Sequence, residues 1–435
     1  MTQGHPAAVD GTFMTRFQMI AIICCWLLNI MDGFDLMTMG LAAPQVMREW
    51  GVADMAMGLV FSATSVGMAI GALALAPLAN RFGRRRITLI SAAVITISVL
   101  ATAFASSAMH LVLLRFCSGI GFGALIVQLN LYVYELASGR WRTTMVAALH
   151  IGFPFGAMLA GAIAAVVLEP MGWRWLFIIA AAMTGAVTLL ALLALPESME
   201  DLLSRRPVDA LARINNVRTR MKQAPLQEMP ELIAADRASI GWRPLFSAAY
   251  LRPTIAIWLA CLCYALPLHY VFNWTPKVLE NYGLSSTYAS LGSTVIGLSG
   301  IVGALLMGWL SRRFGPKKIT TIYFVAAAVG AAAFAVASPT PFNLLFALGI
   351  MGGAISGSYS GLMLMAMGIY DGATRNTGVS LAIGVGRIGA ILGPSFGAML
   401  IAAQFGRLTI YMIMGVIAVL GAVSVWMSAR RGARV

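Results

Sequence analysis

Charged side chains are scarce in this sequence, and this scarcity decides its broad class. Of the 435 residues, 11% are charged and 60% are hydrophobic, whereas a soluble globular chain carries about 25% charged residues. A chain with so little charge needs lipid as well as its own interior to cover its apolar side chains. The composition therefore predicts an all-α protein that crosses a membrane many times.

Cysteine and histidine are also rare, at five and four residues. The cysteines lie inside apolar runs, where Cys24 and Cys25, like Cys261 and Cys263, would point in different directions from a helix. This arrangement predicts neither a disulfide nor a metal site. The apolar runs contain no nucleophile–base set and no phosphate-binding Gly-Lys-Ser/Thr loop, so we expect no enzyme activity and no cofactor.

Twelve apolar runs account for most of the chain. Because a backbone in lipid must pair its own polar groups, each run is expected to form a helix. The runs predict two pseudo-symmetric six-helix bundles, over 1–195 and 251–435, joined by a cytoplasmic linker over 196–250 in which 208–222 could form a short surface helix. The predicted spans lie near residues 17–43, 54–79, 86–106, 108–136, 142–168, 173–195, 252–280, 286–311, 318–337, 341–369, 376–403 and 406–429.

The net charge of +14 could indicate a nucleic-acid partner, but the placement of the cations indicates a membrane topology instead. If the N-terminus is cytoplasmic, 24 Lys and Arg residues fall on the inner side of the predicted helices and four on the outer side. This bias predicts that both termini are cytoplasmic and that the inner cations contact anionic lipid. Residues 1–16 do not read as a cleavable signal peptide. We expect a monomer in the inner membrane, without a nucleic-acid partner.

A repeated segment relates the two predicted bundles. Residues 71–88 read GALALAPLANRFGRRRIT and residues 303–320 read GALLMGWLSRRFGPKKIT, with nine of the 18 aligned positions identical. Each copy leads from the second helix of a bundle into the third, through a turn at Gly83 or Gly315. Bundles repeated in this way place a substrate site between them, near the middle of the membrane.

Several short motifs resemble those of one transporter family. Three of them are similar to motifs of the major facilitator superfamily: RFGRRR at 81–86, the spacing of Glu135 and Arg142, and LPES at 195–198. Four more resemble the aromatic acid:proton symporter family within it: DGFDL at 32–36, NWTP at 273–276, RNTGV at 375–379 and GVGRIGAILGP at 384–394. The resemblance implies the major facilitator fold and a function in proton-coupled transport of an aromatic acid.

The sequence also departs from the resembled pattern. Ala76 and Asn80 stand where the loop motif of the superfamily has Gly and Asp, and Arg312 stands at the Asp position of the second copy. Tyr359 takes the place of a polar Gln in the tenth helix. The loop therefore lacks its usual acid, and these differences bear on the substrate more than on the fold.

Two acids, Asp32 and Asp35, lie inside the first apolar run, where an ionised carboxylate costs about 2.5–3.5 kcal/mol. Three residues apart, they share a helix face, and Gly33 between them would allow a close approach by another helix or by the substrate. Two neighbouring acids in a low-dielectric site cannot both ionise readily, so we expect them to carry protons. Arg115, at a similar depth in the fourth span, is the expected partner of Asp35. A static structural ion pair is the alternative.

Arg387 lies in the membrane part of the second half, among several glycines. Its guanidinium could bind a carboxylate through two parallel hydrogen bonds, and the resemblance implies a required role. The alternative is that it pairs with an acid such as Asp35. Polar and aromatic side chains could complete a site for a planar, oxygenated ring, although an interhelical hydrogen bond is the simpler interpretation of each. These candidates are His150, Gln128, Asn273, Trp274, Tyr359 and Tyr264.

A group of residues at the predicted cytoplasmic ends of the helices is expected to form a gate. Surface ion pairs contribute only about 0–1 kcal/mol each, so a latch made of them could close the inner side and separate on opening. Cations that only set the topology are the alternative. The group comprises Arg81, Gly83, Arg84, Glu135, Arg142, Arg313 and Arg375.

Together these features predict a secondary transporter that imports a small organic acid with protons by alternating access. The family resemblance implies an aromatic carboxylate as the substrate. A proton-coupled transporter of another organic anion, or a drug exporter, is the alternative within this class. A non-transporting membrane sensor is the alternative from another class, but the linker 196–250 is too short and irregular for a signalling domain.

Overall fold

The apolar runs form 12 helices long enough to cross a membrane within the described residues, which confirms the predicted fold class. The computed structural model describes residues 14–138, 141–229, 243–247, 250–370 and 372–428. The spans of the first half are α1 (Arg16–Trp50), α2 (Asp54–Ile70, continued by short turns to Leu78), α4 (Arg84–Thr102), α5 (Ala108–Leu136), α6 (Arg142–Met171) and α7 (Trp173–Ala194). Those of the second half are α10 (Leu251–Asn281), α11 (Ser286–Phe314), α12 (Pro316–Val336), α13 (Pro341–Ile369), α14 (Gly372–Ala402) and α15 (Arg407–Met427).

Local sequence signals set several helix ends. Thr15 begins α1 with a capping box, in which its side chain and that of Gln18 bond each other's backbone N–H groups. The repeated turns at Gly83 and Gly315 have φ angles of +100° and +83°. Other residues rarely adopt this conformation, so the two glycines separate consecutive helices in both halves. Short helices α3 (Ala79–Phe82), α8 (Met199–Arg205) and α9 (Ala210–Arg220) complete the first half and the linker.

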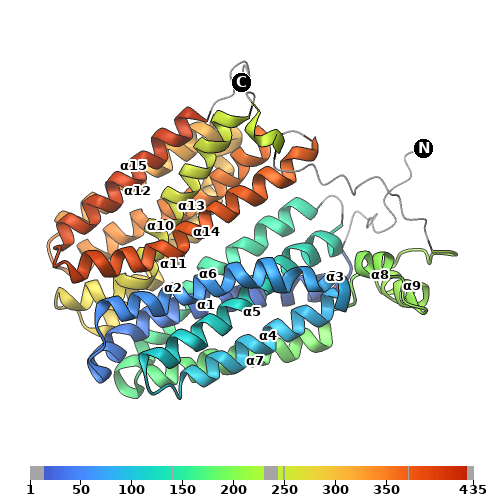
Figure 1. Cartoon of the computed structure of the whole chain (residues 1–435), viewed down its shortest axis with the longest axis horizontal. Coiled ribbons are helices and arrows are strands. Elements are labelled where there is room, and N and C mark those ends of the chain that lie inside the picture. The colour runs from blue at the N-terminus through green and yellow to red at the C-terminus, as the bar shows by residue number, and fades with distance from the viewer. Residues whose placement is uncertain (1–13, 139–140, 230–242, 248–249, 371, 429–435) are drawn as a thin grey trace.

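The spans pack in two groups, one from each half, with the same internal pairing (Figure 1). In the first group α1 packs on α6 and α7, while α5 packs on α2 and α4. In the second group α10 packs on α14 and α15, while α13 packs on α11 and α12. Matching helices of the two halves thus have matching neighbours, as the sequence repeat predicts.

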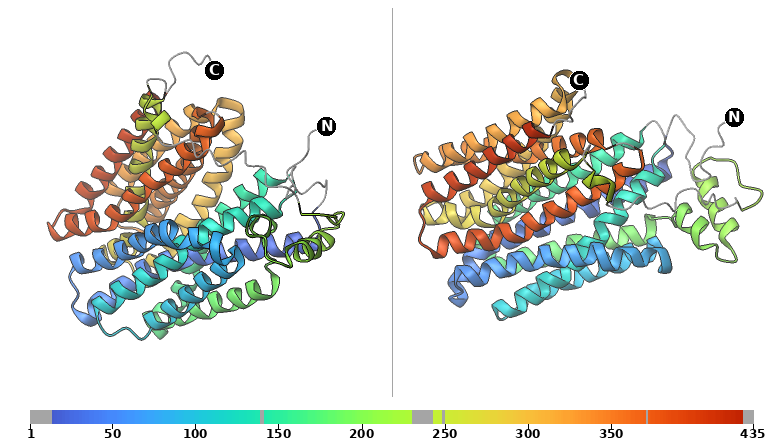
Figure 2. Two further views of the ribbon diagram at one scale, coloured as in Figure 1. Left: turned by 45° about the vertical axis from the view of Figure 1, so that its right-hand side comes forward. Right: turned by 45° about the horizontal axis from the view of Figure 1, so that its top comes forward.

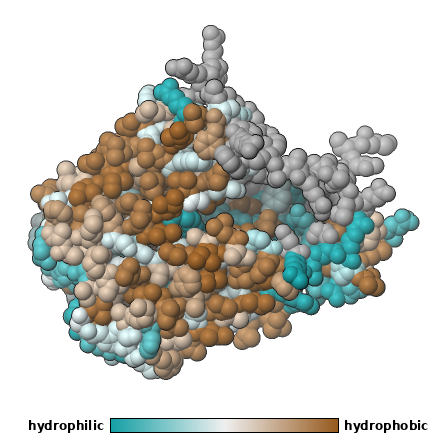
Figure 3. All heavy atoms as spheres, viewed as in Figure 1, coloured by the Kyte–Doolittle hydropathy of each residue, from teal (hydrophilic) through white to brown (hydrophobic). Residues whose placement is uncertain are grey.

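The two groups touch at one end of their helices and separate at the other. We call the end near α8 and α9 the linker side and the opposite end the distal side (Figures 1 and 2). Toward the distal side, a Cβ on Gly40 would lie 2.7 Å from the carbonyl oxygen of Phe272, and one on Gly58 would lie 2.5 Å from Cβ of Ala398. The groups are therefore in backbone contact there. Toward the linker side they diverge, and Figure 3 shows a hollow between them with hydrophilic residues in its depth.

Candidate functional site

Asp35 and Arg115 form a buried ion pair between α1 and α5. Nη1 of Arg115 donates to Oδ1 of Asp35 at 2.7 Å, and Nη2 donates to Oγ1 of Thr102 at 3.0 Å. The guanidinium also lies 5.3 Å from the ring centroid of Phe177. Both charged side chains are almost fully buried, with exposed fractions of 3% and 1%. The structure thus brings together the two residues that the sequence predicted as partners, and it excludes a pair between Asp35 and Arg387 in this conformation.

Asp32 has a different environment, one turn earlier on the same helix face. No side chain or backbone group of the described residues donates a hydrogen bond to it, although Asp35 and Arg387 are near enough to interact electrostatically. The residue is 5% exposed. Gly33 holds α1 against α6, because a Cβ there would lie 1.9 Å from the carbonyl oxygen of Phe153. Asp32 is therefore positioned by close helix packing, while its carboxylate stays free to take a proton or a ligand.

Arg387 extends from α14 toward the first half. Its Nη1 lies 3.6 Å from the sulfur of Met68 on α2, a weak contact for a guanidinium. Gly389 and Gly393 allow α14 to pack on α10, since their Cβ atoms would lie 3.0 Å and 2.6 Å from carbonyl oxygens of that helix. Gly384 faces open space instead. Arg387 is half-buried and has no carboxylate partner among the described residues, so its donors are available to a ligand.

Tyr264 of α10 and Tyr359 of α13 lie within electrostatic range of Arg387. Their rings stack with centroids 5.3 Å apart and an interplanar angle of 27°. Both are half-buried. A guanidinium within electrostatic range of two stacked rings suits a ligand that is both aromatic and anionic. His150 lies on α6 of the first half and is exposed.

Three other predicted substrate residues bond backbone oxygens of the protein in this conformation, so their role in substrate binding stays a prediction. Gln128 donates to the carbonyl oxygen of Ala76 at 3.1 Å, where α2 ends in an irregular turn. Asn273 donates to the carbonyl oxygen of His269, one turn back on α10. Trp274 is fully buried and donates to the carbonyl oxygen of Pro394 at 2.9 Å. Each side chain satisfies a buried backbone oxygen, the simpler interpretation that the sequence left open.

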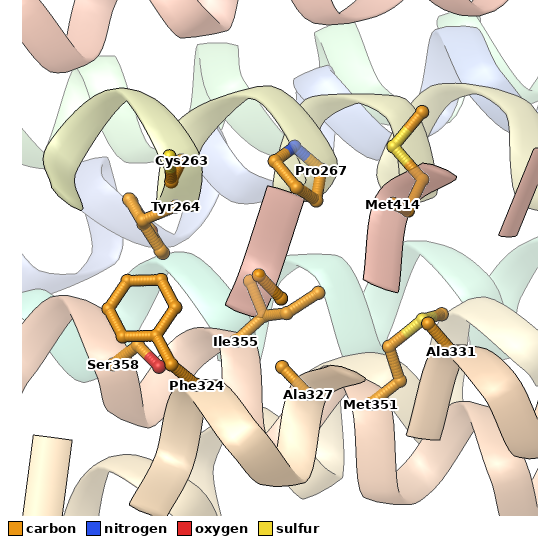
Figure 4. Close-up of a pocket in the computed structure, with 11 residues that line it drawn as sticks. Cys263, Tyr264, Pro267, Phe324, Ala327, Ala331, Met351, Ile355, Ser358 and Met414 are labelled. Carbon is orange, nitrogen blue, oxygen red and sulfur yellow. The ribbon is translucent and has the colours of Figure 1, made fainter. Parts of the chain in front are cut away.

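A small cavity inside the second half does not belong to the hollow between the groups. It lies among α10, α12, α13 and α15, where Tyr264, Phe324, Ile355 and Met351 surround it (Figure 4). Its volume of about 10 Å³ suffices for at most one water molecule. The lining is apolar, so we interpret the cavity as a packing void on the far side of the tyrosine pair.

The predicted gate residues form a network within the first half. Arg84 donates to Glu135 at 2.8 Å and to Ser198 at 3.0 Å. Glu135 in turn accepts hydrogen bonds from the Ser198 hydroxyl and from the backbone N–H groups of Met199 and Glu200. The carboxylate therefore caps the first turn of α8 and fastens the linker to α5. The pair is intact in this conformation, and its separation during the transport cycle stays a prediction.

The loop that lacks its usual acid receives one from the linker. Oδ2 of Asp201 would lie 3.4 Å from a Cβ on Gly83, and its carboxylate accepts a hydrogen bond from the backbone N–H of Arg84. Burial raises the pKa of the Asp201 carboxyl above its ordinary value, and Arg205 only partly offsets this rise. Asp201 thus places a carboxylate at the turn between α3 and α4. Nothing in the local sequence indicated this, because the contact depends on how α8 docks.

The remaining gate candidates contact rings rather than acids. The guanidinium carbon of Arg142 lies 4.6 Å from the ring centroid of Tyr134, that of Arg81 5.5 Å from Phe82, and that of Arg313 5.3 Å from Phe314. The side chain of Arg375 lies outside the described part of the structure. None of these described contacts joins the two groups.

Two ion pairs on the distal side do join the groups, and sequence reasoning missed both. Nη1 of Arg48 lies 2.6 Å from Oε2 of Glu280, and Lys277 is paired with Asp54. The partners lie more than 200 residues apart in sequence, so no local pattern could have matched them. Their positions indicate that charge pairs hold the distal side closed.

Two repeated six-helix groups around a charged hollow, closed at one end, define the class of membrane transporters that alternate access between their two sides. The chain belongs to the Major Facilitator Superfamily, whose sequence profile matches residues 25–341 and 270–434. No group of three or more His, Cys, Asp or Glu side chains in the described structure could hold a metal ion.

Individual relatives support this assignment. The chain is 29% identical to a gallate transporter of Pseudomonas putida over 96% of this chain and 93% of the relative. It is 30% identical to the 4-hydroxybenzoate transporter PcaK of the same species over 89% and 87%. Its fold resembles the partially occluded inward open conformation of the xylose transporter XylE from E. coli, with a TM-score of 0.75, 18% identity, and coverage of 94% and 97%. The predicted family resemblance is confirmed, and so is the prediction that the chain is a transporter and no enzyme.

Proposed function

We propose that this protein is a proton-coupled symporter that imports a small aromatic carboxylate across the inner membrane. The observation that carries the proposal is that Arg387 lies within electrostatic range of the stacked rings of Tyr264 and Tyr359 and of the unbonded carboxylate of Asp32. The relatives named for gallate and 4-hydroxybenzoate transport support a substrate with one carboxylate on a hydroxylated ring.

The binding chemistry follows from the groups that lack protein partners. The substrate carboxylate would pair with the guanidinium of Arg387, whose planar fork fits two oxygens. The substrate ring would lie against the edge of the tyrosine pair, at a distance typical of aromatic contacts. His150, exposed on the opposite half, could bond a ring hydroxyl when the two groups approach each other.

Proton coupling is assigned to Asp32. In the described structure Asp32 has no hydrogen-bond donor, and it lies near Arg387, the cation that the substrate also needs. Its ionised carboxylate would therefore compete with the substrate for Arg387. Protonation of Asp32 would release Arg387 for the carboxylate, so proton and substrate would load together. The buried pair of Asp35 and Arg115 would hold α1 in register. Import of an anion against an inside-negative potential needs one proton for neutrality, and a second proton if voltage is to drive uptake.

The linker side is assigned to the cytoplasm, because the cations concentrate there. In this orientation the described conformation is open to the cytoplasm. The outward-facing state would require the pairs Arg48–Glu280 and Asp54–Lys277 to separate while the linker side closes. Residues 1–195 and 251–435 would move as two bodies. Since the hollow forms within a single chain, a monomer suffices.

The test is uptake by the purified protein in liposomes with an imposed pH gradient, acidic outside. Labelled 4-hydroxybenzoate and gallate are the primary probes, with succinate as a non-aromatic control acid. We expect accumulation of at least one aromatic acid above its equilibrium level, which collapses when a protonophore is added.

Accumulation of succinate but of neither aromatic acid would overturn the substrate class. Accumulation that survives the protonophore would overturn proton coupling. Extrusion of a preloaded acid, driven by the same gradient, would assign the protein as an exporter. Absence of any flux for the whole panel would favour a non-transporting role.

A further inference from the structure

A groove runs along the outer surface of the second half, between α11 and α12, with α13 as its floor. Its volume is about 480 Å³. Leu298, Val302 and Leu306 of α11 and Ile322 of α12 line it and are all exposed. In a membrane protein this surface faces lipid rather than water, so the occupant must be apolar over the length of the groove.

The length of the groove matches one leaflet of a bilayer. Along α11 its lining extends from Val295 to Leu306, a rise of roughly 16 Å at the helical repeat. One leaflet of the hydrocarbon core is about 15 Å thick. The floor is formed partly by Gly349 and Gly353, which lack side chains that would fill the groove. A single extended acyl chain therefore fits its length and its chemistry.

Four cations stand at the linker-side end of the same helices. They are Arg312, Arg313, Lys317 and Lys318, and none of them pairs with a carboxylate in the described part of the chain. Lys317 instead lies 4.8 Å from the ring centroid of Trp426, an aromatic residue at this end of α15. Lys318 is one helical turn from Ile322 at the end of the groove, a rise of roughly 6 Å.

Two of the four cations in the first copy of the repeat are bound by the protein itself. Arg84 is paired with Glu135, and Arg85 donates to the carbonyl oxygens of Leu195 and Leu192 at 2.8 Å and 2.6 Å. In the second copy Pro316 replaces the first of these arginines. Within the described structure, Lys317 thus lacks the backbone partners that Arg85 has at the equivalent position of the first half.

We propose that this surface binds an anionic phospholipid, with its phosphate at Lys317 and Lys318 and one acyl chain in the groove. The charge of the cluster selects the headgroup, and the apolar groove beside it selects a molecule that carries a chain. The inference depends on neither the substrate nor the proton coupling of the transporter, so it can fail or succeed separately from them.

The experiment measures lipid binding to the purified full-length protein by native mass spectrometry, with dioleoylphosphatidylglycerol and dioleoylphosphatidylcholine as probes. We expect the anionic lipid to bind at least ten-fold more tightly. Each cation near a membrane surface contributes about five-fold to such binding. Lys318→Gln should therefore weaken binding about five-fold, and the double variant Lys317→Gln/Lys318→Gln about 25-fold. Arg86→Gln, the equivalent change in the first half, is the matched control and should leave this site unchanged.

A second variant tests the acyl chain. A Cβ on Gly349 would contact only Cγ1 of Val295, at 3.3 Å, so Gly349→Leu should project into the groove and weaken the anionic lipid while all cations remain. Gly349→Ala is its control for folding and should bind like the wild type. Equal binding of the two lipids, equal loss from Arg86→Gln and Lys318→Gln, or full displacement of the lipid by millimolar inorganic phosphate would each overturn the proposal.

Discussion

The two acids of α1 lie one turn apart, yet one belongs to a closed core and the other to an open hollow. Asp35 is paired with Arg115, which Thr102 and Phe177 also contact. Asp32 has no hydrogen-bond donor among the described residues, and it interacts only electrostatically with Arg387 and Asp35. Two identical side chains on one helix face can thus differ in function, because the neighbouring helices bring a cation to Asp35 and leave Asp32 unpaired.

Removal of the Arg115 guanidinium from the closed core should have the largest effect, a loss of stability. Arg115→Ala leaves Asp35 buried without a partner, which costs about 3–5 kcal/mol of stability. We expect a sharply lower melting temperature in mild detergent and poor yield from the membrane. The double variant Asp35→Leu/Arg115→Met removes both charges and should recover most of the stability. Equal stability of wild type and Arg115→Ala would contradict the description of Asp35 as a structural acid.

Neutralisation of Asp32 in the open hollow should abolish proton coupling while the stability of the protein stays close to that of the wild type. Asp32→Asn removes no hydrogen bond that the protein makes, so its melting temperature should stay close to that of the wild type. Gradient-driven accumulation should be lost, whereas exchange of substrate between two equally loaded sides should persist. Both activities are measured in the same liposomes. Proton-driven accumulation at the wild-type level in Asp32→Asn would assign coupling to another group.

Substitution of Arg387 tests how the carboxylate of the substrate is bound. Arg387→Lys keeps the charge but loses the planar fork. Loss of one charged hydrogen bond corresponds to about ten-fold weaker binding of 4-hydroxybenzoate, measured by titration calorimetry. Stability should change little, because Arg387 is half-buried and bonds only the sulfur of Met68. Unchanged affinity would mean that the carboxylate binds elsewhere.

The smallest effect, a change in the affinity for 4-hydroxybenzoate, is expected from substitution of Tyr359 in the tyrosine pair. Tyr359→Phe keeps the stacked ring and should bind 4-hydroxybenzoate almost as the wild type does. Tyr359→Ala removes an aromatic contact that contributes about 0.5–1.5 kcal/mol, which lowers the affinity by about two- to twelve-fold. Equal losses from both variants would assign the role to the phenol hydroxyl rather than to the ring.

Most of the fold could be predicted because it follows from the period and length of the apolar runs. Eleven of the 12 spans lie within about four residues of their expected ranges, whereas the first continues to Trp50 and not to 43. The helix α9 of the linker falls inside the predicted 208–222. The partnership of Asp35 with Arg115 could also be predicted, since the topology places both at one depth. Depth alone could not decide whether the side chains of Gln128, Asn273 and Trp274 face the hollow or a neighbouring helix. Depth along a helix is readable from the sequence, whereas rotation about the helix axis toward the hollow or toward a neighbour is not.

The sequence by itself determined the class of protein, the repeat and the helix that carries the intramembrane acids, because composition, apolar length and charge bias are properties of the chain alone. Only the tertiary structure decided which acid is locked and which is free, and that Arg84 and Arg85 of the first repeat are bound by oxygens of the described chain while Lys317 of the second is not. Contacts between α1 and α5, between α8 and the first half, and across the distal side join residues far apart in sequence. Such contacts depend on how whole helices pack, and no local pattern encodes them.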